Sequence, residues 1–129
     1  MSLKEWIKEL NNIVFFGGAG VSTESNIPDF RSDNGLYKKQ YPYPAEVMLS
    51  HSFYESNPKE FFEFYFNQMI YKDAKPNKAH LALAQLEKQG KLKAVITQNI
   101  DGLHQAAGSK TVYELHGSVL RNTCTGCHE

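Results

Sequence analysis

Three short apolar runs divide this chain, and each leads directly into a polar, loop-forming motif. Their β-branched and aromatic residues are typical of buried strands, and they lie at 13–16, 93–96 and 111–115. Between and around them, apolar residues recur at helical spacing, which predicts helices at 3–10, 57–71, 77–89 and 103–107. Strands alternating with helices predict an α/β fold with a parallel sheet, in which the motifs after the strands meet at one edge.

The predicted helices differ in how much of their surface is apolar. The helix at 57–71 carries a dense aromatic set, so we expect it to be almost wholly buried. The helix at 3–10 opens with a capping box, Ser2 and Glu5, and we expect its apolar stripe to pack on the core. The stretch 32–52 has loop composition, with a helical turn at 45–49.

The first strand runs into a glycine-rich turn followed by a short predicted helix at 21–25. Gly18 and Gly20 allow the backbone to approach a ligand closely, and free N–H groups at a helix start favour a phosphate. Pro28 then stiffens the exit of the loop and brings Phe30 and Arg31 near the same point. The alternative interpretation is a plain strand-to-helix turn, which the glycines alone would equally predict.

The glycine turn departs from the dinucleotide fingerprint of ordinary dehydrogenases. Thr23 stands where the third glycine of that pattern belongs, and no acidic residue follows near position 40 to read a ribose. An ordinary nicotinamide dehydrogenase is therefore disfavoured.

Composition limits the remaining classes. The chain has 129 residues, with 14 basic and 14 acidic side chains that cancel, so we expect one domain and neither a nucleic-acid nor a membrane partner. The apolar runs are too short to span a bilayer, and the first residues do not begin a secretory signal. The two cysteines, Cys124 and Cys127, form no disulfide framework, which predicts a reducing, cytoplasmic setting.

Six sequence blocks, taken together, resemble the sirtuins, the NAD-dependent protein deacylases. In chain order the blocks are GAGVS at 18–22, IPDFRS at 27–32, PNKAH at 76–80, TQNIDGLH at 97–104, ELHGS at 114–118 and CTGC at 124–127. Each block is weak alone, but the order and spacing of all six make the resemblance specific.

The resemblance implies a Rossmann-like parallel sheet, here partial, with an inserted small helical and zinc-binding module. The Rossmann-like segments would be 1–31 and 92–120, the helical insertion 32–90, and the start of the zinc module 121–129. The sequence looks like the N-terminal half of a sirtuin catalytic domain.

The family also implies NAD as cofactor and a set of site residues. His116 and Asn99 would be catalytic, with His116 as the general base that takes a proton from a ribose hydroxyl, since imidazole exchanges protons near neutral pH. The residues implied to contact the cofactor are Gly18, Ala19, Gly20, Thr23, Phe30, Arg31, Gln98, Asn99, Ile100, Asp101 and His116.

The same resemblance implies zinc and an acyl-lysine substrate. Cys124 and Cys127 would be one pair of a site that needs four ligands, and His128 is badly placed to add a third. Sirtuins that prefer acidic acyl groups carry a Tyr and, three residues later, an Arg. Here Tyr65 is followed at that spacing by Gln68, so the expected substrate is an acetyl-lysine protein or peptide.

Two further functions use the same residues. The chain could be an inactive NAD- or ADP-ribose-binding fragment, or an association module acting through an unpaired sheet edge. Protein ADP-ribosyl transfer is the other alternative. We expect residues 1–129 alone not to deacylate peptides.

Overall fold

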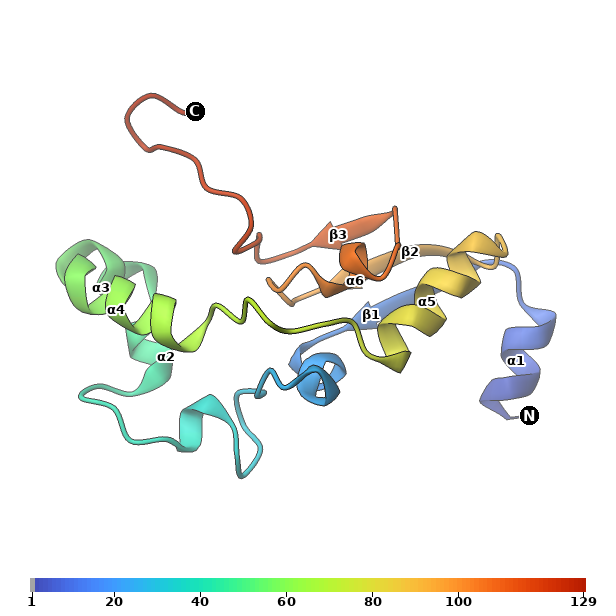
Figure 1. Ribbon diagram of the computed structural model, residues 1–129, viewed down its shortest axis with the longest axis horizontal. Coiled ribbons are helices and arrows are strands. Elements are labelled where there is room, and N and C mark those ends of the chain that lie inside the picture. Colours follow the sequence, from blue (N-terminus) through green and yellow to red (C-terminus); the bar gives the residue numbers. More distant parts are fainter. Residues whose placement is uncertain (1) are drawn as a thin grey trace.

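The computed structural model describes residues 2–129 and places the three strands in one parallel sheet (Figure 1). The strands are β1 (Ile13–Gly17), β2 (Leu92–Thr97) and β3 (Val112–Glu114), and their order in the sheet is β1-β2-β3. The register aligns Phe16 with Ile96 and Ile96 with Tyr113. The predicted α/β architecture is thus confirmed, and the central strand β2 is the only one of these three paired on both sides.

Helices cover one face of this sheet and leave the other face exposed. The helices α5 (Lys78–Lys88) and α6 (Leu103–Ala106) lie together on the same side of the strands in Figure 1. Under them, Leu92 and Val95 of β2 are buried. On the opposite face, Val14 and Phe16 are 55% and 61% exposed. The expectation that the first apolar run is fully buried is therefore wrong, since alternate residues of a strand point to opposite faces.

The first helix, α1 (Leu3–Glu9), is anchored by its ends. The predicted capping box of Ser2 and Glu5 is present. At the other end, Lys91 donates from Nζ to the carbonyl oxygens of Ile7 and Lys8. No residue of α1 is buried, so the expected core packing of its apolar stripe is wrong for the described residues.

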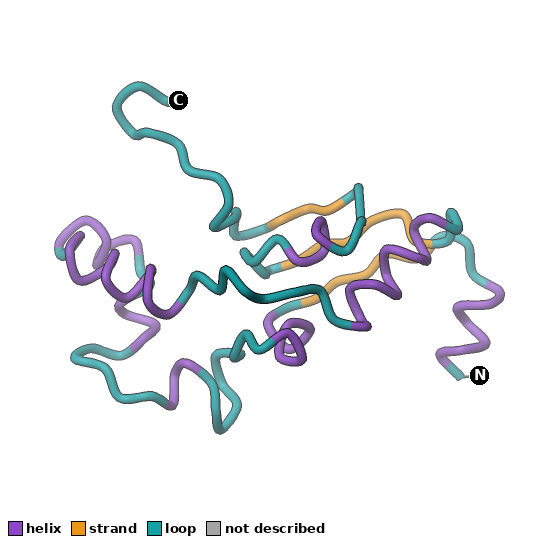
Figure 2. Tube along the Cα trace, viewed as in Figure 1, coloured by secondary structure: helices purple, strands orange, loops and turns teal. Residues whose placement is uncertain are grey.

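The connection between β1 and β2 carries a helical module with its own apolar core. Its elements are η1 (Ala19–Ser25), η2 (Leu36–Lys38), α2 (Ala45–Met48), α3 (His51–Ser56), α4 (Pro58–Gln68) and then α5. Helices α2 to α4 cluster away from the sheet, as the purple segments of Figure 2 show. Their core consists of Ala45, Met48, Phe53 and Phe64. The stretch 32–52 is therefore less irregular than its composition predicts.

The aromatic helix α4 is buried on one face only. Phe64 is 5% exposed, but Phe62 and Phe66 are 42% and 60% exposed, so the expectation of almost complete burial is wrong. Among the helices of this module, α4 contacts α3 and α2, which cover one side of it. The hydrophobic pattern could not reveal this, because the aromatic residues occupy more than the buried stripe.

Residues 121–129 extend from the sheet as a tail without helix or strand (Figure 1). Cys124 and Cys127 are exposed, free thiols. Within residues 2–129, no cluster of three or more His, Cys, Asp or Glu side chains is arranged to hold a metal ion. No helix in that range has the length and apolar character to cross a membrane.

Candidate active site

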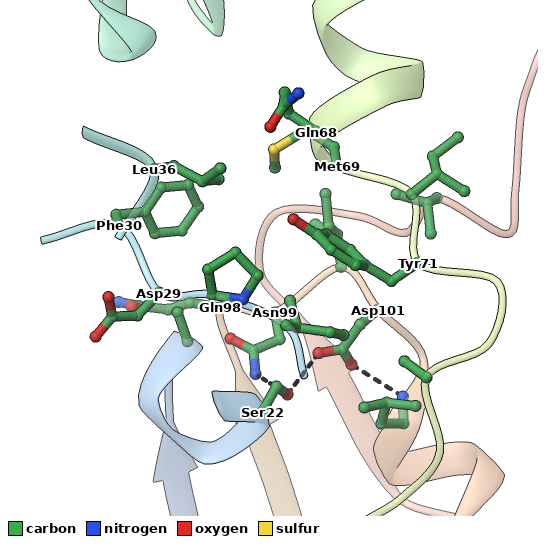
Figure 3. Close-up of a pocket in the computed structure, with 18 of the residues that line it drawn as sticks. Ser22, Asp29, Phe30, Leu36, Gln68, Met69, Tyr71, Gln98, Asn99 and Asp101 are labelled. Atoms are coloured by element: carbon green, nitrogen blue, oxygen red, sulfur yellow. Dashed lines mark hydrogen bonds between the residues drawn. The ribbon is translucent and has the colours of Figure 1, made fainter. Parts of the chain in front are cut away.

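A cavity of about 940 Å³ lies at the carboxyl ends of the strands, between the sheet and the helical module. The loops after β1, β2 and β3 all contribute to its wall, as the strand-and-motif pattern predicts. In Figure 3, Phe30 and Leu36 lie on one side of this cavity, Gln68 and Met69 lie above it, and Asn99 and Asp101 lie below. The wall therefore joins apolar side chains of the module to polar side chains of the sheet edge.

Most of the predicted site residues meet in this cavity. Those that line it are Ala19, Gly20, Phe30, Arg31, Gln98, Asn99, Ile100, Asp101 and His116. Gly18 and Thr23 are not among the lining residues. The predicted metal ligands Cys124 and Cys127 lie outside it, on the exposed tail.

Gly18 and Thr23 shape the loop from outside the cavity. A Cβ built on Gly18 would lie 3.1 Å from Oε1 of Gln98, so the absence of a side chain lets these two loops approach. Thr23 is exposed and donates from Oγ1 to the carbonyl oxygen of Gly20 at 3.0 Å. Asn26 then ends η1 in the left-handed region at φ 62°. Asn tolerates that conformation better than most residues.

Ser22, which lines the cavity, is the centre of a buried hydrogen-bond network at its wall. Its Oγ donates to Oδ2 of Asp101 at 2.6 Å and accepts from Nδ2 of Asn99 at 3.1 Å. Both bonds are drawn in Figure 3. Because the amide nitrogen of Asn99 faces Ser22, its Oδ1 is left as the acceptor on the other side of the group.

His80 closes this network from α5. The backbone N–H of Asn77 donates to Nδ1 of His80 at 3.2 Å, so Nδ1 is an acceptor and the ring proton sits on Nε2. That Nε2 lies 3.5 Å from Oγ of Ser22, and the tautomer makes it the donor of a long hydrogen bond. Asn77 also donates from Nδ2 to the Val21 carbonyl at 2.7 Å. The start of α5 is thus fixed to the glycine loop.

Sequence reasoning assigned no place in the site to Ser22, Asn77 or His80, although Asn77 was expected to cap the helix at 77–89 and does so. All three lie inside the sequence blocks of the resemblance, and that position was the only signal available. Their contacts join segments more than 50 positions apart, which spacing along the chain does not report.

Two buried histidines lie side by side next to this network. The ring of His104 is 4.8 Å from that of His80, at an interplanar angle of 66°. Burial lowers the pKa of His80, against a smaller opposing effect of Asp101. Burial likewise lowers the pKa of His104, and a charge on His80 would lower it further. Both rings are therefore neutral at neutral pH.

His116 is held by the loop of the neighbouring strand. Its Nδ1 lies 3.0 Å from the carbonyl oxygen of Gln98. A carbonyl oxygen only accepts, so Nδ1 carries the proton and Nε2 keeps an unshared electron pair. An imidazole in this tautomer can accept a proton at Nε2.

The segment that carries Phe30 and Arg31 folds back on itself. The N–H of Leu36 donates to the Asp29 carbonyl, and that of Tyr37 to the Phe30 carbonyl, both at 2.8 Å. The guanidinium of Arg31 lies 5.8 Å from the centroid of the Tyr37 ring. This turn sets Phe30 against the cavity.

Gln68 lines the cavity from the end of α4, whereas Tyr65 is not among the lining residues. Tyr41 donates its hydroxyl hydrogen to Oε1 of Gln68 at 3.1 Å, which leaves the side-chain N–H groups of Gln68 as donors. Burial raises the pKa of Tyr41, so this hydroxyl keeps its proton. The end of α4 therefore presents a neutral, hydrogen-bonded amide.

Three loops around a cavity at the carboxyl edge of a parallel sheet define a Rossmann-like α/β protein, a class in which ligands bind at that edge. The comparisons with known proteins give the family. The Sir2 family model matches residues 18–129. The chain belongs to the Sir2 family.

Two curated relatives and one solved structure illustrate the match. A NAD-dependent protein deacetylase of Clostridium acetobutylicum is 67% identical over 127 residues, covering 97% of this chain and 52% of that protein. One of Clostridium tetani is 68% identical over 130 residues, covering 99% and 53%. A Sir2 structure with a p53 peptide and NAD+ superposes with a TM-score of 0.80 at 44% identity, covering 100% of this chain and 51% of that one. The chain spans about half the length of the curated relatives that it matches.

Proposed function

We propose that this chain carries the catalytic site of an NAD-dependent protein-lysine deacetylase. The observation that carries the proposal is the orientation of His116, whose Nδ1 donates to the Gln98 carbonyl and leaves Nε2 as a proton acceptor on the same cavity as Asn99 and Asp101. The names of the relatives and the peptide and NAD+ in the similar Sir2 structure support the same activity.

The residues of the cavity fit the phosphates of NAD in their chemistry. Gly20, which lines the cavity, is exposed and no atom lies within 4 Å of a Cβ built on it, so its backbone is open to a pyrophosphate. Arg31 supplies a cation on the same wall. When bound, NAD would supply the ribose carbon from which nicotinamide leaves and the ribose hydroxyl that receives the acyl group.

The polar residues after β2 would orient the nicotinamide end. Asp101 uses one oxygen for Ser22 and the other for the Leu103 N–H, and each oxygen keeps a further acceptor site for a carboxamide N–H. Asn99 is 8% exposed, and its Nδ2 rather than its Oδ1 bonds to Ser22. Its Oδ1 could therefore accept a hydrogen bond from a ribose hydroxyl. Gln98 and Ile100 would complete this wall.

His116 would act as the general base. Its Nε2 would take the proton of a ribose hydroxyl, so that this oxygen would become the nucleophile for the acyl carbon and the lysine amine would be the leaving group. The hydrogen bond from Nδ1 to Gln98 stabilises the charge that the ring then carries. Phe30 would help exclude water from the cavity.

The substrate we propose is an acetyl-lysine side chain of a protein or peptide. Gln68 offers a neutral amide rather than a cation, so it favours an uncharged acyl group over an acidic one. We also propose a reducing, cytoplasmic setting, because the two cysteines of the sequence, Cys124 and Cys127, form no disulfide framework.

Cys124 and Cys127 would supply half of a structural zinc site. Hydrogen bonds from the backbone N–H groups of Cys127 and Gly126 lower the pKa of the Cys124 thiol, and the thiolate is the form that binds zinc. Residues 2–129 hold only this pair, while a tetrahedral site takes four ligands. The pair therefore fits zinc only together with ligands from elsewhere, and no catalytic step depends on it.

The competing proposal is a fragment that binds NAD or ADP-ribose without turnover, favoured by the half-length match to the relatives. The test follows nicotinamide release from NAD with and without an acetyl-lysine peptide, for the wild type and for His116→Ala. Release that needs both the peptide and His116 supports deacetylation by this chain. Binding without release supports the fragment, and release with labelling of protein by ADP-ribose supports ADP-ribosyl transfer.

The role of His116 can also be tested in a longer chain, independently of whether residues 1–129 are active alone. Placing residues 1–129 in the frame of a full-length relative should restore release if the isolated chain is inactive. His116→Ala in that frame should remove it. Full activity of that variant would contradict the role of His116.

A further inference from the structure

His104 is a buried histidine whose ring nitrogens have no hydrogen-bond partner among the described residues. The residue is 1% exposed, and both Nδ1 and Nε2 are fully enclosed. A neutral imidazole always carries one N–H, and burying that group unpaired costs free energy that a Phe or Leu would not. Packing alone therefore does not explain a histidine at this position.

The turn that carries His104 repeats the spacing of the turn that carries His80. In the first turn, Asn77 accepts from the N–H two residues later, and His80, three residues later, accepts from the Asn77 N–H. In the second, Asp101 accepts from the Leu103 N–H at 2.9 Å, and His104 again follows three residues later. His80 has both nitrogens in use, whereas His104 has both free.

The groups that face His104 come from three elements. Phe15 of β1 contributes an uncharged ring 5.9 Å away, and His80 of α5 contributes the ring at 4.8 Å. Among residues 2–129, Asp101, in the loop before α6, supplies the one negative charge that raises the pKa of His104, against the larger lowering by burial. Protonating Nδ1 of His80 would break its bond with the Asn77 N–H, whereas the unprotonated ring nitrogen of His104 can take a proton without breaking a hydrogen bond.

We propose that His104 is a positioning residue that makes nucleotide binding sensitive to acid, by offering Asp101 an alternative partner. With His104 neutral, Asp101 accepts from Ser22, and the Ser22 hydroxyl, oriented in this way, accepts from the Asn99 amide and holds it in place. With His104 protonated, its ring N–H, three residues along the same turn, pairs with the Asp101 carboxylate and draws it from Ser22. The effect on nucleotide binding rests on the proposed NAD site, whereas the exchange of hydrogen-bond partners by Asp101 is independent of it.

The exchange of partners can be observed without any nucleotide. Ring ¹⁵N signals of the histidines and the side-chain amide signals of Asn99 are followed by NMR in the 129-residue chain from pH 8 to pH 5. We expect the His104 ring to gain a proton and the Asn99 amide signals to move with the same midpoint. In His104→Phe, which keeps the ring shape, the Asn99 signals should not move with that midpoint. A His104 ring that stays neutral to pH 5, or Asn99 signals that ignore its titration, would overturn the inference.

NAD affinity measured by calorimetry at pH 7.5 and pH 5.5 gives the functional arm. Wild type should lose affinity about tenfold more than His104→Phe over this range, since one hydrogen bond to a charged group accounts for about that factor. His104→Gln, which also cannot be protonated, repeats the test if the Phe variant does not fold. His51→Phe, an exposed histidine beside Glu55, is the control and should keep the wild-type profile. Equal pH profiles for wild type and both His104 variants would overturn the inference. Absence of NAD binding at every pH would contradict the proposed function, and the NMR titration would then decide whether Asp101 exchanges its partner.

Discussion

Ser22 donates its hydroxyl hydrogen to Asp101 over 2.6 Å, although the two residues lie 79 positions apart in the sequence. This bond joins the loop after β1 to the loop after β2, and both loops line the cavity. The same hydroxyl accepts from Asn99, so the direction of that amide depends on it. Ser22 therefore controls the geometry of two residues that we propose to contact the nucleotide.

Replacing Ser22 by Ala should weaken NAD binding about tenfold or more. The change removes a hydrogen bond to a charged carboxylate and leaves the Asn99 amide without its acceptor. Calorimetric titration with NAD measures the effect. Ser52→Ala, on the exposed surface of α3, is the matched control and should bind as wild type. Unchanged affinity in Ser22→Ala would show that the network does not position the site.

Acidification should destabilise the fold already at pH values well above those at which carboxylates titrate. The folded state lowers the pKa of His80 and of His104, mainly by burial, so the unfolded chain binds more protons below about pH 6.5. The free energy of unfolding should therefore fall as the pH drops from 7.5 to 5.5. Urea unfolding at these values measures it, and His104→Phe should show a shallower fall. A free energy that is constant or rises on acidification would contradict this prediction.

Glu87 fixes the start of β3, and its replacement by Gln should lower the free energy of unfolding by about 1 kcal/mol. Its two carboxylate oxygens accept the backbone N–H groups of Lys110 and Thr111, each at 2.8 Å. Burial raises the pKa of Glu87, but these hydrogen bonds outweigh it and the net pKa is lowered. Glu63→Gln, on the exposed side of α4, should leave unfolding unchanged. Equal midpoints for the two variants in urea would refute the role of Glu87.

Gly102 lies in the loop after β2, and Gly90, before β2, is its matched control. Both have positive φ, 72° and 75°, so Ala at either position should cost about 1 kcal/mol of stability. A Cβ added to Gly102 would lie 2.6 Å from Cδ1 of Leu120. A Cβ added to Gly90 would have no neighbouring atom within 4 Å. Only Gly102→Ala should weaken NAD binding, because Gly102 and Leu120 both line the cavity. Similar affinity losses in both variants would contradict this difference.

Phe15 and Phe16 are adjacent on β1 but lie on opposite faces of the sheet. Phe15 packs toward His104, whereas Phe16 is 61% exposed. In the 129-residue chain, Phe15→Ala should lower the free energy of unfolding by about 2 to 3 kcal/mol, and Phe16→Ala should change it by less than about 1 kcal/mol. Urea unfolding compares the two. A larger loss for Phe16→Ala would show that its face is covered in solution.

The sequence predicted the three strands and the edge at which their loops meet. Apolar runs followed at once by GG, QNID and HG motifs carry that information locally, since a parallel sheet brings the ends of its strands together. Nine of the eleven residues implied to contact NAD line the cavity, and Gly18 and Thr23 support its glycine loop from outside.

Tertiary structure alone decided which apolar surfaces are covered. Phe16 and Phe66 have the same hydrophobic character as Phe15 and Phe64, and only the placement of α5, α6, α2 and α3 separates the buried members from the exposed ones. Periodicity reports a face of a strand or helix, whereas burial depends on what packs against that face.

The buried polar network likewise depends on the fold. No pattern in the sequence predicts that Ser22 bonds to Asp101 or that His80 lies beside His104, because the members of each pair belong to separate loops and helices. Local sequence determined the strands, the turns and the chemistry at each strand end. The packing of α5 and α6 on the sheet decided which of those groups form hydrogen bonds with one another. A hydrogen bond requires a donor and an acceptor within about 3 Å, whatever their separation along the chain.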